Sequence, residues 1–119
     1  MPSHDVEIES SLSHRGIASR LRTALRQIAN LVGHYRKALE LDGRNMMALN
    51  NLAYILLEYA NQPDEGLMFA QKAAEVAPDS PVVQDTLGWA FYRKGMYADA
   101  LKYLERAASK QRLVRRIRG

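Results

Sequence analysis

The chain has 119 residues, of which 47% are hydrophobic and 25% are charged, which is the balance of one small globular domain. It has no cysteine, so disulfides and thiolate metal sites are excluded. The N-terminal residues carry acids and lack the apolar core of a signal peptide. No segment approaches the roughly eighteen continuous apolar residues that a membrane span needs. We therefore expect a cytoplasmic protein.

The net charge of +4 is distributed unevenly. Residues 38–109 carry more acids than bases, whereas the last ten residues carry five Lys or Arg and no acid. The basic character thus comes from the ends of the chain. This weakens any expectation that the folded surface binds nucleic acid.

The first part of the chain predicts a tail followed by a long helix. Residues 1–13 are polar and lack a period, so we expect them to be disordered. From Ile17 to Leu39, apolar residues recur every three or four positions, which predicts one amphipathic helix over residues 14–43. The N-terminal half of its apolar stripe has no partner in the sequence, so it either caps a stack of helices or meets a second copy.

Residues 46–80 predict a first helical hairpin. Asn45 can cap its first helix with a side-chain oxygen, and Pro63 suits the first turn of the return helix, where no amide donor is required. The apolar spacing on the first helix reads Leu49-x-x-Leu52-Ala53-x-x-Leu56.

Residues 81–110 predict a second hairpin, followed by a basic tail over residues 111–119. Ser80 is the expected N-cap, and Gly95 the expected turn residue between the two helices. Gly88 and Ala100 are small where the two helix axes approach each other. We expect the inner face of the second helix to hold Tyr97, Ala100, Leu101, Leu104 and Ala108.

The two hairpins resemble each other, and both resemble the tetratricopeptide repeat, a helix–turn–helix unit of about 34 residues. Leu52-Ala53 of the first hairpin corresponds to Leu87-Gly88 of the second. The second hairpin also has the family spacing in Ala100-x-x-x-Leu104. The resemblance implies an all-α solenoid of helical hairpins with about five helices. The long first helix then belongs to a degenerate first repeat.

The resemblance also implies a concave groove lined by the first helix of each hairpin. The positions that it assigns to this groove are Asn50, Asn51, Tyr54, Glu58, Asp85, Thr86, Trp89, Tyr92 and Arg93. Asn51 falls where the family often uses asparagine to bind a ligand backbone. For Tyr54 and Trp89 two interpretations stay open, contact with a bound peptide or packing against the neighbouring unit.

The charges of these groove positions indicate which peptide would suit them. Glu58 and Asp85 are acidic, and Arg93 is the single cation. An acidic terminal peptide is therefore a poor ligand, and a basic or mixed apolar segment is favoured. An interface formed by two helix faces is small, below roughly 1,200 Å², so binding near micromolar is expected.

No set of residues predicts catalysis, a metal site or a cofactor. The histidines at positions 4, 14 and 34 are too far apart in the sequence to share one helical turn, and glycine-rich phosphate loops are missing. Asp64 and Glu65 are adjacent acids at a helix start, where they complement the helix dipole.

The sequence therefore predicts a non-catalytic scaffold that binds a peptide or a partner protein in the groove. One alternative is a homo-oligomer assembled through the N-terminal helix. Attachment to an acidic partner, to nucleic acid or to an anionic membrane through the basic tail ranks below both.

Overall fold

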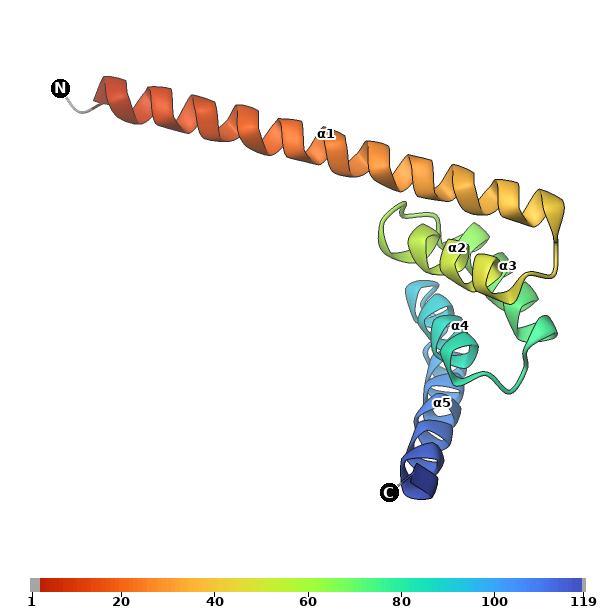
Figure 1. The fold of residues 1–119 in the computed structure, drawn as a ribbon. Helices are drawn as coiled ribbons and strands as arrows, with labels where there is room; N and C mark the ends of the chain where they lie inside the picture. Colours follow the sequence, from red (N-terminus) through yellow and green to blue (C-terminus); the bar gives the residue numbers. More distant parts are fainter. Residues whose placement is uncertain (1–2, 119) are drawn as a thin grey trace. The chain divides into compact units, whose positions relative to one another are not determined.

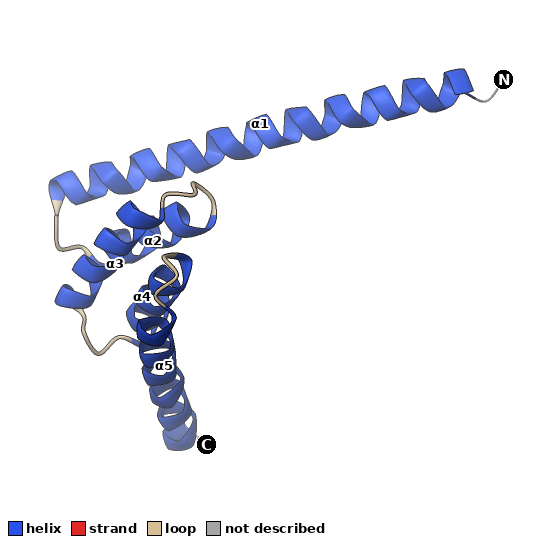
Figure 2. Cartoon of the chain, turned by 180° about the vertical axis from the view of Figure 1, so that it is seen from behind, coloured by secondary structure: helices blue, strands red, loops and turns tan. Residues whose placement is uncertain are grey.

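The computed structural model describes residues 3–118, with side chains from residue 16 onward except those of 114, 117 and 118. Over these residues the chain forms five helices and no strand (Figure 2), which confirms the all-α prediction with a long first helix. The helices are α1 (Ser3–Leu41), α2 (Met46–Glu58), α3 (Pro63–Val76), α4 (Pro81–Arg93) and α5 (Tyr97–Arg118). None of the described helices is both long enough and apolar enough to cross a membrane. The chain divides into two compact units, residues 1–31 and 32–119.

In the second unit, α2 to α5 form two helical hairpins that stack on each other (Figure 1). Helix α2 packs against α3, α4 packs against α5, and α4 also contacts both α2 and α3. One buried cluster joins the hairpins, with Leu57 and Ala70 from the first and Leu87 and Phe91 from the second. Burial of apolar area between successive hairpins is what stabilises a helical repeat stack.

The last turns of α1 belong to this second unit and contact its first hairpin. Leu39 packs against the buried cluster around Leu49. Arg36 Nη2 lies 2.6 Å from Glu65 Oε1, and the Tyr35 hydroxyl accepts a 3.3 Å hydrogen bond from Asn51 Nδ2. Residues 32–41 therefore contact both helices of the first hairpin, α2 through Tyr35 and α3 through Arg36.

The helix starts predicted from the capping residues are confirmed. The Asn45 side chain accepts a hydrogen bond of 3.1 Å from the Ala48 amide at the start of α2. The Ser80 hydroxyl accepts one of 3.4 Å from the Val83 amide at the start of α4. Pro63 is the first residue of α3, where its missing N–H leaves no bond unmade.

The turn between α4 and α5 is closed by Gly95, as predicted. Gly95 has a φ of 77°, in the left-handed region that glycine adopts at little cost. Its amide donates to the Tyr92 carbonyl at 3.0 Å, and the Met96 amide donates to the Phe91 carbonyl at 2.8 Å. These two bonds form a Schellman motif, which satisfies carbonyls that the end of α4 would otherwise leave free.

The predicted inner face of α5 is wrong in part. Ala100 is buried as expected, but Leu101 is 59% exposed, and Tyr97 and Ala108 are also exposed. The packed stripe instead runs through Ala100, Tyr103, Leu104 and Ala107. Helix α5 carries two apolar stripes, and α4 covers the one that begins at Ala100.

Both ends of the chain differ from the sequence prediction. Helix α1 begins at Ser3, whereas we expected residues 1–13 to be disordered. Helix α5 continues to Arg118, through most of the segment expected to form a tail over residues 111–119. Neither extension contains an interior glycine or proline, and lengthening an existing helix costs much less than starting one. Positive charge is also favourable in the last turns of α5.

Candidate functional site

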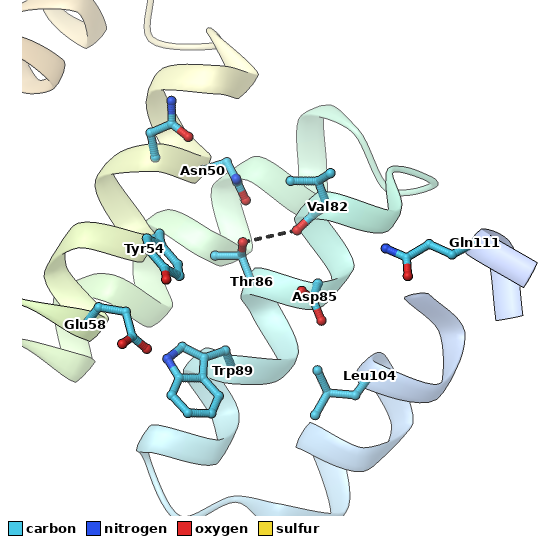
Figure 3. A pocket seen from close by; sticks show the side chains of 10 residues that line it. Asn50, Tyr54, Glu58, Val82, Asp85, Thr86, Trp89, Leu104 and Gln111 are labelled. Atoms are coloured by element: carbon cyan, nitrogen blue, oxygen red, sulfur yellow. Dashed lines mark hydrogen bonds between the residues drawn. The ribbon is translucent and has the colours of Figure 1, made fainter. Parts of the chain in front are cut away.

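Helices α2 and α4 form two walls of a cavity of about 460 Å³ (Figure 3). This volume lies in the usual range for ligand pockets, about 300–1,000 Å³. Leu104 and Gln111 of helix α5 also line the cavity. The remaining lining residues are Asn50, Asn51, Tyr54 and Glu58 of α2 and Val82, Asp85, Thr86 and Trp89 of α4. We call this cavity the groove.

The burial pattern of α2 explains why these side chains line the groove. Leu49, Leu52 and Leu56 are buried in the repeat body. Tyr54 and Glu58, one helical turn apart, are exposed on another face of the same helix. Burial of the leucines thus fixes the rotation of α2 and turns the polar and aromatic side chains toward the groove.

Seven of the nine residues predicted for the groove line it, and two do not. Tyr92 instead stacks on Trp89, with ring centroids 5.1 Å apart and an interplanar angle of 15°. Arg93 donates from Nη2 to Asn61 Oδ1 at 3.4 Å. Both lie in the last turn of α4, which leads into the turn at Gly95. These two predicted residues therefore lie outside the lining of the cavity.

The polar groups of the groove are more buried than the sequence indicated. Asn50 and Thr86 are each only 7% exposed. Thr86 donates its hydroxyl to the Val82 carbonyl at 3.1 Å (Figure 3), whereas Asn50 Oδ1 has no hydrogen-bond partner among the described residues. Asn51 is held by the Tyr35 hydroxyl. Asn50 is therefore the asparagine with an unused acceptor.

Trp89 is half-buried and occupies one end of the groove. Its indole Nε1 has no hydrogen-bond partner among the described residues, and in Figure 3 it points toward the carboxylate of Glu58. Tyr54 lies across the groove on α2, where its ring meets that of Tyr59 edge-on at 6.3 Å. Two aromatic side chains from different hairpins thus border one cavity.

The groove is acidic. Glu58 and Asp85 line it, and no described lining residue carries a positive charge. Neither carboxylate forms an ion pair with a described residue. Elsewhere on α4 and α5, Arg93 is bound to Asn61, and Lys110 Nζ lies 3.1 Å from the Asp79 carboxylate.

The sequence analysis missed the contribution of α5 to the groove. Leu104 was expected on the inner face of the hairpin, and Gln111 follows it by seven residues, which is two helical turns on the same face. Gly88 is the residue from which this contribution could have been predicted. Because it has no side chain, Leu104 of α5 can pack against α4 at this point and reach the groove. A methyl group at Gly88 would lie 2.8 Å from Leu104 Cγ.

Two comparisons relate the chain to known proteins. A family model described as a tetratricopeptide repeat matches residues 34–67. The chain is also 34% identical over 89 residues to the TPR repeat-containing protein PA4667 of Pseudomonas aeruginosa. Residues 34–67 thus contain a tetratricopeptide repeat, and the chain is similar to a protein named for such repeats. The alignment covers 75% of this chain but 15% of that relative, so the chain spans a small part of the relative's length.

The matched repeat covers the end of α1, all of α2 and the first turns of α3. It therefore includes residues 34–41, the degenerate segment that contacts the first hairpin. Tetratricopeptide repeats generally mediate protein–protein interaction, and proteins of this family are typically non-catalytic scaffolds. The described residues contain no group of three His, Cys, Asp or Glu side chains that could hold a metal ion.

Proposed function

We propose that the protein is a non-catalytic scaffold that binds a segment of a partner protein in the groove between α2 and α4. The observation that carries this proposal is the placement of Tyr54 and Trp89, from successive repeats, in the wall of one cavity. Aromatic side chains supply a large contact area at a low cost in conformational entropy, and they dominate the binding energy of many interfaces.

The unpaired groups of the groove support a peptide as the ligand. Asn50 Oδ1 is an acceptor and Trp89 Nε1 is a donor, and neither has a partner among the described residues. Both atoms are buried, so a peptide, which carries donors and acceptors, pairs with them only where the side chains of the groove shift on binding. An unpaired buried polar group costs about 1–3 kcal/mol, and pairing it on binding recovers part of that cost.

The test is capture of the partner from an extract by immobilised protein. The double variant Trp89→Ala with Tyr54→Ala should lose the partner because both aromatic contacts are removed. Tyr97→Ala is the matched control, since Tyr97 is an exposed aromatic residue of α5 that does not line the groove. Helicity measured by circular dichroism should stay near that of the wild type. Undiminished capture by the double variant contradicts the proposal.

A second candidate function is self-association through α1. Ile17, Leu21 and Leu25 share one face of this helix and are 49%, 58% and 61% exposed. A stripe of exposed apolar residues at this spacing suits pairing with another helix. Light scattering at micromolar concentration should then show an oligomer that Leu21→Lys with Leu25→Lys dissociates, while Thr23→Lys has no effect. A monomeric wild-type chain contradicts this candidate.

A further inference from the structure

We propose that the groove selects a partner segment that presents an arginine side chain to Trp89, between Glu58 and Asp85. This inference rests on the proposed function, because it names the chemistry of the segment that the groove binds. It starts from the charge of the groove, in which two carboxylates line the wall and no described lining residue is a cation.

The two carboxylates line the same cavity as one aromatic ring, that of Trp89. Asp85 precedes Trp89 by four residues on α4, so the two side chains are neighbours on one helix face. Glu58 comes from α2, and Figure 3 shows its carboxylate beside the indole nitrogen of Trp89. A cation that enters here meets negative charge from both helices beside the half-buried indole of Trp89.

Among the described residues, no cation forms an ion pair with Glu58 or Asp85. Arg93, the last residue of α4, is bound to Asn61, and Lys94 is paired with Asp64. Lys110 of α5 donates to both the carbonyl and the carboxylate of Asp79. The described ion pairs thus leave Glu58 and Asp85 for a charge supplied from outside.

Arginine fits this arrangement better than lysine. The guanidinium is flat and stacks on an aromatic ring, and it is less strongly hydrated than an ammonium group. It has five N–H donors in a fixed fork, so it can form two parallel hydrogen bonds to one carboxylate. Asn50 Oδ1, which has no partner among the described residues, adds a neutral acceptor in the same wall. A carboxylate ligand would instead meet two like charges.

Trp89 is the single tryptophan of the chain, so its fluorescence reports on this site without labelling. The probe is a nine-residue peptide of alanine, leucine and glycine with one central arginine. Versions with lysine, glutamine or glutamate at the centre serve as comparisons. The arginine peptide should bind about tenfold more tightly than the glutamate peptide, since each carboxylate of the groove attracts one and repels the other. Its affinity should also fall as salt is added.

Variants of the protein separate the arginine preference from the groove itself. Glu58→Gln with Asp85→Asn should weaken the arginine peptide by about three- to tenfold and leave the glutamine peptide unchanged. Glu40→Gln is the matched control, because Glu40 is an exposed acid of α1 that does not line the groove. Equal affinity for the arginine and glutamate peptides, or no effect of the double variant, overturns the inference.

The outcomes also distinguish this inference from the proposed function. If all four peptides bind equally and Trp89→Ala abolishes their binding, the groove binds peptides but does not select arginine. If none binds and the Trp89→Ala, Tyr54→Ala variant still captures the partner, the groove is not the binding site. Both results overturn the arginine preference, and only the second also overturns the proposed function.

Discussion

Replacing Gly88 by alanine tests the packing of the second hairpin, and the same change at Gly33 is its control. Both glycines lie inside a helix, but only Gly88 is crowded by a neighbouring helix. Gly88 lies inside α4, where a methyl group would be 2.8 Å from Leu104 Cγ and 3.2 Å from the Ala100 carbonyl oxygen. Gly33 lies inside α1, within the same compact unit, and a methyl group there meets nothing within 4 Å. Both substitutions give the same gain in helix propensity, so their difference isolates the close contact.

Two effects set the expected changes in the free energy of unfolding: the higher helix propensity of alanine and the crowding of the added methyl group. Alanine is more favourable than glycine in a helix interior by about 0.8–1.0 kcal/mol, so Gly33→Ala should raise the free energy of unfolding by up to about 1 kcal/mol. Overpacking a tight contact costs about 1–3 kcal/mol, so Gly88→Ala should be less stable than Gly33→Ala by about that amount. Urea unfolding followed by circular dichroism measures both, and the slope m should not change.

A double-mutant cycle identifies the atoms responsible. In a Leu104→Ala background the crowding side chain is absent, so Gly88→Ala should cost less than in the wild type by about 1–3 kcal/mol. If Gly88→Ala stabilises the wild type as much as Gly33→Ala does, the contact between α4 and α5 is looser than described. If the two substitutions are additive, Leu104 is not the residue that resists the methyl group.

Three further substitutions test the ends of the helices by the same unfolding measurement. Gly95→Ala should cost about 1–2 kcal/mol, because alanine resists the left-handed backbone that closes α4, and no loss would contradict the positive φ. Ser80→Ala should cost about 1 kcal/mol through loss of the N-cap bond to Val83, with Ser109→Ala on the exposed face of α5 as the control. Lys110→Ala should cost less than about 1 kcal/mol, because its partner Asp79 is almost fully exposed, and a larger loss would show that the pair fixes α5.

The boundaries of the middle helices were predictable because local chemistry sets them. Asn45, Ser80 and Pro63 act within one turn of the position that they occupy, and Gly95 acts on the backbone of its own residue. Such signals need no knowledge of the rest of the fold. The family resemblance then supplied the arrangement of the hairpins, which no single helix contains.

The packed face of α5 was not predictable in the same way. The stripe through Leu101 and the stripe through Ala100 both have helical spacing, so periodicity alone cannot choose between them. The choice depends on α4, where Gly88 accepts Leu104 and brings Ala100 against the facing backbone. The groove was predicted as a set of positions, but the bond from Asn51 to Tyr35 depends on how the end of α1 meets α2.

In both hairpins a leucine of one helix packs against a glycine of the other. The two residue types are exchanged between the first and the second helix. In the first, Ala53 and Leu57 lie on the groove helix α2, and the glycine that receives them is Gly66 on α3. In the second, Gly88 lies on the groove helix α4 and receives Leu104, which follows Ala100 by one turn on α5. The exchange keeps the helix axes close in both hairpins. Only in the second hairpin does it carry a leucine of the return helix into the wall of the groove, because there the glycine is on the groove helix. The packing of α4 on α5 and the shape of the groove therefore depend on the same contact.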